Sequence, residues 1–273
     1  MLSYRHAFHA GSPADVLKHA VLAFVLRYAT RKQSGLYVLD THAGAGGYDL
    51  GSPMAAKTGE AQAGIARLRD APEPWPALLA PYLRLVRRAD GYPGSPLIAT
   101  ALLRPQDRLE LVELHPTDHA ALAERFRGAS RVRVVREDGL NVMVARMPPP
   151  ERRAIVLVDP SYEVKTEYET VIAALARAYR RFPTGTYLLW YPVIERPRAD
   201  GVLAALAATG IRAQYRIELG MRPDEAGRGM TGSGLVVVNP PFTLPKVAEE
   251  GLPWLAEQLG ATGPTVAGWL VPE

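Results

Sequence analysis

The chain has 273 residues, of which 48% are hydrophobic and 22% charged, enough for one core of roughly 200–250 residues plus an insertion. It contains no cysteine, which excludes disulfides, thiolate metal sites and a cysteine nucleophile. The apolar runs are too short to cross a bilayer, and the first residues lack the apolar stretch of a signal peptide, so we expect a cytoplasmic protein.

The formal net charge is +4, and residues 1–35 contain five basic side chains against the single acid Asp15. Such a basic region suits a polyanion such as nucleic acid, although a solvated helix face with a chance excess of charge gives the same pattern. Within it, Ser12, Pro13 and Asp15 form a capping box that predicts the start of a helix over 14–31.

Short apolar runs then alternate with helical stretches. This alternation predicts a mostly parallel, doubly wound α/β sheet whose ligands lie at the carboxyl ends of the strands. The predicted strands cover 36–40, 109–113, 132–135, 155–159, 187–190, 214–219 and 235–239, and further predicted helices cover 117–127 and 168–181.

The strand rhythm stops between Leu50 and Gly91, where residues rich in Ala, Pro, Leu and Arg show several short helical patterns. We therefore predict a helical insertion at approximately 50–91 within a single domain that spans 1–273. Ser95 and Pro96, which follow this stretch, resemble a helix cap and first turn.

The first predicted strand ends in an acid and a glycine-rich loop, Asp40-Thr-His-Ala-Gly-Ala-Gly-Gly47. A dinucleotide site requires G-x-G-x-x-G, but the third position here is Asp49, whose carboxylate would repel a pyrophosphate. The loop better suits S-adenosylmethionine, which has a zwitterionic amino-acid end and no phosphate. A nicotinamide oxidoreductase and a purely structural turn stay open as alternatives for this loop alone.

Two further acids follow later strands: Glu113 ends one, and Glu137-Asp138-Gly139 comes after another. A carboxylate in the first position can accept both ribose hydroxyls, and one in the second can accept an adenine amino group. Acids are common at strand ends, so each is weak alone, but three in succession favour a cofactor that contains adenosine.

An apolar strand ending in Asp159-Pro160-Ser161-Tyr162 carries the proposed chemistry. An adenine amino nitrogen is a poor nucleophile because its lone pair is delocalised into the ring, so both of its N–H groups need acceptors. The Asp159 carboxylate and the Pro160 carbonyl can supply them. Tyr162 can stack on an extruded base, a contact worth roughly 1–3 kcal/mol. The alternative is that this tetrapeptide is a structural turn at the end of the strand, without a catalytic role.

A second tetrapeptide, Asn239-Pro-Pro-Phe242, matches the amino-methyltransferase pattern (Asp or Asn, Pro, Pro, aromatic) more closely than the first. It follows the last predicted strand, which we expect on the other side of the sheet from the glycine loop. Because the first tetrapeptide is expected beside the glycine loop and the second is not, we assign the acceptor role to Asp159.

Taken together, these motifs resemble the RlmJ family, the bacterial 23S ribosomal RNA adenine-N6 methyltransferases. The resemblance runs from end to end, and the opening residues and LDTHAGAG are specific to that family rather than to methyltransferases at large. The segments that carry it are MLSYRHAFHAG, ADVLKH, LDTHAGAGGY, YPGSPLIA, ELHP, EDG, the Asp-Pro-x-Tyr-Glu motif, LWYP, GMTGSG, NPP and VPE.

The resemblance implies a Rossmann-like class I S-adenosylmethionine-dependent methyltransferase, with a mostly parallel seven-stranded sheet and a small helical insertion. Its implied target is one adenosine of 23S ribosomal RNA, modified before full ribosome assembly. It implies Asp159 as the catalytic acceptor, Tyr4 against the substrate RNA, and His6 and Lys18 along the same entrance. The implied cofactor pocket consists of His19, His42, Ser95, Glu113, Asp138, Gly139 and Asp159.

One motif position departs from the family: Ser161 stands where proline is usual, which loosens the turn and adds a hydroxyl. Because Asp159 and the Pro160 carbonyl are retained, we expect activity. No metal is expected, since no carboxylate or third histidine lies at ligand spacing from His6 and His9, and nothing suggests more than a monomer. A DNA adenine methyltransferase and a non-catalytic RNA-binding assembly factor stay open as alternatives.

Overall fold

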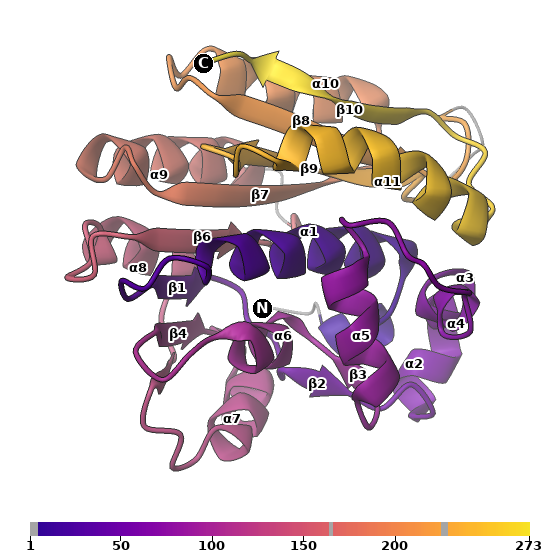
Figure 1. Ribbon diagram of the computed structural model, residues 1–273, viewed down its shortest axis with the longest axis horizontal. Coiled ribbons are helices and arrows are strands. Elements are labelled where there is room, and N and C mark those ends of the chain that lie inside the picture. The colour runs from indigo at the N-terminus through magenta and orange to yellow at the C-terminus, as the bar shows by residue number, and fades with distance from the viewer. Residues whose placement is uncertain (1–4, 164–165, 225–228) are drawn as a thin grey trace.

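The computed structural model describes residues 5–163, 166–224 and 229–273. In this part of the chain one eight-stranded sheet forms the centre of the molecule, in the order β10-β8-β9-β7-β6-β1-β4-β5 (Figure 1). Its strands are β1 (Tyr37–Asp40), β4 (Arg108–Val112), β5 (Val132–Val135), β6 (Ala154–Val158), β7 (Thr186–Val193), β8 (Gln214–Gly220), β9 (Gly232–Val238) and β10 (Thr265–Val271).

Strand direction creates two different edges of the sheet. β5, β4, β1, β6 and β7 pair in parallel, so they all end at one edge, which we term the carboxyl edge. They all begin at the opposite edge, which we term the amino edge. β9 pairs antiparallel with both β7 and β8, so the residues that follow β9 emerge at the amino edge.

The predicted fold class is confirmed, but the prediction of seven strands is wrong because β10 adds an eighth. β10 pairs antiparallel with β8 at the end of the sheet, where Trp269 packs edge-on against Tyr215. Its residues are half exposed and include Gly268, so the segment lacks a strong apolar alternation. Pairing with β8, rather than local pattern, makes it a strand.

Helices cover both faces of the sheet, and the apolar residues of the central strands point alternately into the two layers. α1, α5, α6, α7 and α11 contribute to one layer, while α8, α9 and α10 pack against the other face (Figure 1). The helices are η1 (His6–Phe8), α1 (Pro13–Ala29), α2 (Pro53–Thr58), α3 (Glu60–Ala63), α4 (Ile65–Leu68), α5 (Ala80–Arg88), α6 (Ser95–Leu102), α7 (Pro116–Arg125), α8 (Gly139–Arg146), α9 (Glu167–Arg181), α10 (Arg196–Ala207) and α11 (Leu244–Leu259).

Helix α1 places polar side chains inside the protein. It begins as predicted, with the Ser12 hydroxyl accepting a hydrogen bond from the backbone N–H of Asp15 at 3.3 Å. Every residue from Ala14 to Leu26 is buried, because α1 lies between the sheet and α5, α6 and α11. Its first turns carry Asp15, Lys18 and His19, so three ionisable groups are held in the interior.

The stretch between β1 and β4 contains α2, α3, α4 and α5, and it is closed by a short antiparallel pair, β2 (Gly47–Tyr48) with β3 (Tyr92–Pro93). The interpretation of 50–91 as an insertion into a single domain stays a prediction. The expected cap at Ser95 is wrong by one residue: Gly94 is the N-cap of α6, and Ser95 is its first helical residue.

Among the described residues, no helix has both the length and the apolarity needed to span a bilayer.

Candidate active site

A cavity of about 220 Å³ opens at the carboxyl edge of the sheet. Its walls come from the loop after β1, the ends of β4 and β6, the start of α8 and the first turns of α1. The expected site residues His6, Lys18, His19, His42, Ser95, Glu113, Asp138, Gly139, Asp159 and Pro160 all line it. Tyr4 lies outside the described residues, so its predicted contact with RNA stays a prediction.

Asp159 is held at the floor of this cavity by a lysine that lies 141 residues earlier in the chain. Lys18 Nζ lies 2.6 Å from Asp159 Oδ2 and 2.8 Å from Asp15 Oδ1. The Lys18 side chain is only 5% exposed, so it lies deeper than the entrance position that the resemblance implies. Lys18 therefore orients one oxygen of Asp159, and the Oδ1 oxygen makes no hydrogen bond within the described residues.

The buried groups Asp15, Lys18 and Asp159 shift one another's pKa values. Burial opposes the charge of Lys18, but the adjacent carboxylates of Asp15 and Asp159 outweigh it and raise the Lys18 pKa above its ordinary value. Burial also acts to raise the pKa of Asp15, yet His6 and Lys18 hold it well below the ordinary range. For Asp159 burial prevails over Lys18, so its pKa is raised. Lys18 is thus a fixed cation beside a carboxylate that is partly desolvated.

The N-terminal segment closes one side of the cavity. His6 Nε2 lies 2.9 Å from Asp15 Oδ2, and the His6 ring packs against Tyr48 with centroids 5.2 Å apart. Arg5 Nη2 forms a 3.0 Å ion pair with Asp118, which also lines the cavity. Asp15 therefore connects the segment that carries His6 to the lysine that holds Asp159. The sequence motif marks Asp15 only as part of a helix cap, although its contacts with His6, Gly11 and Lys18 all lie within nine residues of it.

Asp40 ends β1 beneath the cavity and is nearly unpaired. Its Oδ1 accepts a 3.3 Å hydrogen bond from the backbone N–H of His42, while its Oδ2 is buried and has no partner in the described part of the chain. Burial raises the Asp40 pKa to about 6, and the neighbouring Ser95 hydroxyl limits this rise. A buried carboxylate oxygen without a donor is a ready acceptor for a cationic ligand group.

The two predicted adenosine contacts are positioned by backbone groups. Glu113 accepts from the N–H of Gly44 at 2.8 Å and from that of His115 at 2.7 Å, which aims its carboxylate along the glycine loop. Burial raises the pKa of Glu113, although these two donors oppose the rise. Asp138 is the N-cap of α8, with its Oδ1 accepting from Asn141 N at 2.9 Å. Each carboxylate keeps acceptor capacity for a ligand.

Glycines bring the backbone close to the cavity at two positions. Gly44 has φ 59°, and a Cβ there would lie 2.3 Å from the Tyr48 hydroxyl. A Cβ on Gly139 would lie 1.9 Å from the carbonyl oxygen of Thr41. Any side chain at either position would force the walls apart, so these glycines define the shape of the cradle.

Both predicted histidines are neutral at physiological pH. Burial lowers the pKa of His19 to about 3 and that of His42 to about 4. His19 Nδ1 lies 2.8 Å from the Tyr92 hydroxyl, which in turn lies 3.1 Å from the Tyr82 hydroxyl. His42 Nδ1 lies 2.8 Å from the Thr41 hydroxyl. These contacts fix both imidazole rings, which contribute neutral polar groups rather than charge.

Tyr162 braces the turn that follows β6 and does not offer a stacking face in this geometry. Its hydroxyl donates a 2.7 Å hydrogen bond to the Trp190 carbonyl, its ring packs 4.4 Å from that of Tyr168, and it is 8% exposed. Trp190 is a neighbour that the motif reasoning did not select. Its ring lies 5.9 Å from Lys18 Nζ, and its indole N–H is buried without a partner in the described residues.

The second tetrapeptide lies far from this cavity. Asn239 follows β9 at the amino edge, and its side-chain N–H groups donate 2.8 Å hydrogen bonds to the carbonyls of Pro183 and Gly185. Because β9 is antiparallel to β7, its last residue pairs with the start of β7, whereas Asp159 follows the end of β6. The antiparallel course of one strand therefore separates two similar motifs.

The cavity fits S-adenosylmethionine. The acidic groups that line it after β4 and at the start of α8, together with a glycine cradle, match a ligand with ribose hydroxyls and an adenine amine, and Asp40, directly before the lining residue Thr41, keeps a buried carboxylate oxygen without a partner in the described residues. With its mostly parallel sheet, the protein is an S-adenosylmethionine-dependent methyltransferase. A family model described as "Ribosomal RNA large subunit methyltransferase D, RlmJ" matches residues 33–271, and the chain belongs to this family.

Full-length relatives agree with this assignment. Two curated proteins named "Ribosomal RNA large subunit methyltransferase J", from Escherichia coli and Haemophilus influenzae, are 47% and 45% identical, and each match covers 100% of both chains. A crystal structure of a Legionella pneumophila protein is 36% identical with a TM-score of 0.87, covering 95% of this chain and 98% of that chain. The nicotinamide oxidoreductase alternative is therefore set aside.

We expect replacement of Asp40 by asparagine to stabilise the protein at pH 8. The folded pKa of about 6 lies above the ordinary value of 3.8, so ionisation of Asp40 opposes folding. This destabilisation is absent below about pH 4, develops between pH 4 and 6, and is complete above pH 6. The gain at pH 8 should reach up to about 3 kcal/mol and vanish at pH 4, as measured by urea unfolding.

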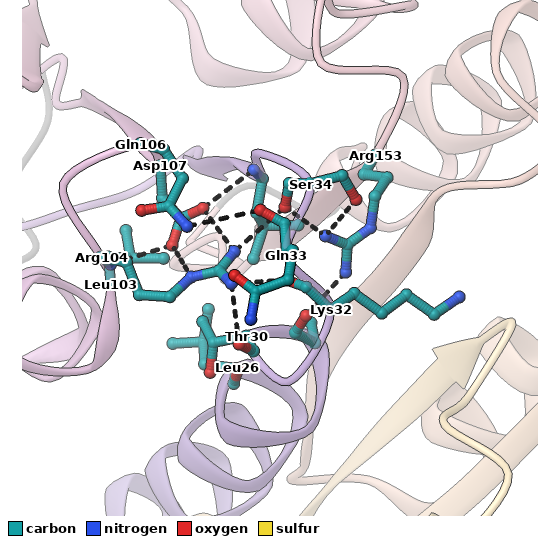
Figure 2. Close-up of polar contacts among 12 residues, drawn as sticks. Leu26, Thr30, Lys32, Gln33, Ser34, Leu103, Arg104, Gln106, Asp107 and Arg153 are labelled. Atoms are coloured by element: carbon teal, nitrogen blue, oxygen red, sulfur yellow. Dashed lines mark hydrogen bonds and ion pairs between the residues drawn. The ribbon is translucent and has the colours of Figure 1, made fainter.

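Asp107→Asn provides the matched control. Asp107 is equally buried but accepts hydrogen bonds from Leu36 N and from three N–H groups of Arg104, and its pKa is lowered (Figure 2). Its replacement should destabilise the protein at pH 8. Binding of S-adenosylhomocysteine, measured by calorimetry, should weaken about tenfold in Asp40→Asn only. Equal destabilisation by both variants would contradict the description of Asp40 as an unpaired carboxylate.

Proposed function

We propose that this protein transfers a methyl group from S-adenosylmethionine to the N6 amino group of a specific adenosine in 23S ribosomal RNA. The printed names of its relatives, which refer to the large ribosomal subunit, support the RNA class. The observation that carries the choice of an amino group is Asp159, a carboxylate oriented by Lys18 in the cavity that the glycine loop also lines.

The residues of the turn act on the adenine amine. Asp159 Oδ2 is occupied by Lys18 Nζ, so Oδ1 accepts one amine hydrogen, and the Pro160 carbonyl accepts the other. These two acceptors draw the nitrogen toward a pyramidal geometry in which its lone pair can attack. Asp159 acts as an oriented acceptor, because even with its pKa raised by burial a carboxylate is too weak a base to remove a proton from a neutral amine. When bound, S-adenosylmethionine would supply the methyl carbon of its sulfonium group: the S–CH3 bond would break as the N6–CH3 bond forms, S-adenosylhomocysteine would leave, and the methylated amine would lose one proton to solvent.

The proposed cofactor contacts come from the loops that follow the parallel strands and from the helices α1 and α6. Glu113 accepts the ribose hydroxyls, and Asp138 accepts the adenine amine of the cofactor. Asp40, which the sequence shows only as an acid at the end of β1, adds a buried carboxylate oxygen that can accept a hydrogen bond. The remaining proposed contacts to the cofactor come from His19, His42, Ser95, Gly139 and Asp159.

The RNA approaches through the mouth of the cavity beside the N-terminal segment. His6 lies there at 18% side-chain exposure, and the proposed contact of Tyr4 belongs to the same segment. Lys18 acts from beneath, through Asp159. We further propose that the protein works as a cytoplasmic monomer on 23S ribosomal RNA before ribosome assembly is complete.

Methyl transfer to purified nucleic acids tests this function. The chain should transfer tritiated methyl groups from S-adenosylmethionine to deproteinised 23S ribosomal RNA but not to duplex DNA, and mass spectrometry should locate N6-methyladenosine at one position. Transfer to DNA alone would support the DNA adenine methyltransferase instead. An unchanged methylation map in a deletion strain would contradict the proposed substrate.

A further inference from the structure

The tetrapeptide Asn239–Phe242, which takes no part in the catalytic cavity, lines a second hollow at the amino edge of the sheet. This groove has a volume of about 380 Å³ and lies between the last turn of α1, the starts of β6 and β7, and the turn after β9. Its basic and aromatic lining residues are Tyr28, Lys32, Arg152, Arg153 and Phe242.

The groove is positively charged. Lys32, Arg152 and Arg153 line it, and no Asp or Glu is among its described lining residues. Lys32 and Arg152 are both exposed, and neither forms an ion pair within the described part of the chain. Arg152 also has φ 53°, a left-handed backbone that a non-glycine residue adopts at a cost of roughly 1–2 kcal/mol. Two unpaired cations on one rim favour an anionic partner.

Backbone contacts hold this rim rigid. Arg104 donates hydrogen bonds to the carbonyls of Thr30 at 2.9 Å and Ser34 at 3.0 Å, and Arg153 donates to the carbonyls of Ser34 at 2.7 Å and Ala29 at 2.6 Å. Figure 2 shows both guanidinium groups directed at this loop, while the Lys32 side chain extends away from the cluster. The loop after α1 is therefore held in place, while the ammonium group of Lys32 is free to contact a ligand in the groove.

An exposed aromatic side chain completes the groove. Phe242 is 89% exposed, whereas the next most exposed large hydrophobic side chain in the described residues is 44% exposed. Tyr28 lines the same groove, with the Arg31 guanidinium 5.4 Å from its ring centroid. Cations along a groove with aromatic faces among them are the composition of sites that bind single-stranded nucleic acid, where bases stack and phosphates pair.

We propose that this groove binds a single-stranded segment of the RNA substrate, with a base stacked on Phe242 and phosphates at Lys32 and Arg152. The inference rests on the proposed function for its choice of RNA. The groove lies at the start of β6 and Asp159 follows its end, so the two sites are separated by roughly 20 Å at 3.3 Å per residue. A long RNA spans both sites, and the groove adds affinity without touching the reacting adenine.

Binding of a complete 23S ribosomal RNA transcript tests the groove, measured by filter retention in the presence of S-adenosylhomocysteine. Phe242→Ala should weaken binding about tenfold, and Phe242→Trp, which keeps a stacking face, should bind like the unmodified protein. The double variant Lys32→Ala/Arg152→Ala should also weaken binding about tenfold. It should lower the slope of log affinity against log salt by about 1.4, because each lost phosphate contact on a single strand contributes about 0.7.

Arg127→Ala is the matched charge control, because Arg127 is 77% exposed near the start of β5 and outside the groove. It should leave transcript binding unchanged. For the groove variants, methyl transfer should show a raised KM for the transcript with kcat unchanged. Ultraviolet cross-linking of the transcript should mark the peptide that contains Phe242.

The outcomes separate this inference from the proposed function. Wild-type protein that methylates the transcript, with groove variants that bind it normally, overturns the inference alone. Wild-type protein that binds but does not methylate the transcript overturns the proposed function. A concentration-dependent dimer that Phe242→Ala dissociates would show that the groove receives a second copy of the chain, and this result overturns an RNA site.

Discussion

Asp159→Ala is expected to lower the rate of methyl transfer to 23S ribosomal RNA by about a thousandfold, the effect of removing one group that stabilises a transition state directly. The substitution removes the acceptor for one amine hydrogen and leaves the amine with its lone pair delocalised. Because burial raises the pKa of Asp159, its carboxylate adds little to folding stability, so the melting temperature should change by only a few degrees. Single-turnover transfer of tritiated methyl groups measures the rate.

Asp159→Asn is the matched control, since an amide oxygen at the same place still accepts a hydrogen bond. It should retain more activity than the alanine variant, with a loss of about ten- to a hundredfold. Calorimetry with S-adenosylhomocysteine should show that both variants still bind the cofactor product. Activity that survives Asp159→Ala and is lost in Asn239→Ala would move the chemistry to the amino edge and contradict the site.

Lys18→Met should have the largest effect on stability. Methionine resembles the lysine side chain in length but carries no charge, so Asp15 and Asp159 would lose the ammonium group that contacts both of them inside the protein. Breaking a buried pair in this way costs about 3–5 kcal/mol, which for a chain of this length lowers the melting temperature by about 10 °C. Thermal unfolding at pH 7 measures this loss.

The same substitution should change the pH dependence of catalysis. Lys18 opposes the rise in the pKa of Asp159, so its removal raises that pKa further. The acidic limb of the kcat profile should therefore move to higher pH, because Asp159 acts in its ionised form. A purely structural role for Lys18 would lower stability and leave this limb in place.

Two controls accompany Lys18→Met. Lys246→Met removes a lysine that is 81% exposed and lies 3.9 Å from Glu250, and it should change stability by less than about 0.5 kcal/mol. Asp15→Asn/Lys18→Met removes an acid together with the cation and should recover part of the lost stability. Greater destabilisation in the double variant than in the single one would contradict the role of Lys18 as the shared cation.

Local pattern predicted most of the fold. The predicted strand over 155–159 corresponds to β6 within one residue at each end, and the predicted start of α1 at Ser12 is confirmed by its capping contact. These segments were predictable because burial on both faces requires continuous apolar runs, and because caps are local. β10 was missed, since a half-exposed edge strand becomes a strand only through its partner β8.

The expected site residues were less evenly predictable. Glu113 and Asp159 could be found because acids that follow parallel strands meet at one edge of the sheet. Asp15 was recognised only as a helix cap, although its contact with Lys18 lies within one turn of α1. Trp190 could not be found, because its contact with Lys18 depends on how α1 packs against the sheet. Tyr162 was expected to present its ring to a base, but the Trp190 carbonyl captures its hydroxyl and turns the ring inward.

The amino-acid order alone determined the α/β class, the glycine-rich loop after β1 and the chemical nature of the acceptor, since each depends on residues that are neighbours in the chain. Strand order predicted which of two similar tetrapeptides faces the cofactor cavity, and strand direction in the folded sheet is what separates them. The antiparallel β9 carries Asn239 to the amino edge, whereas the parallel β6 delivers Asp159 to the carboxyl edge. Only the folded chain brings Lys18 within 2.6 Å of Asp159, because that contact joins residues 141 positions apart.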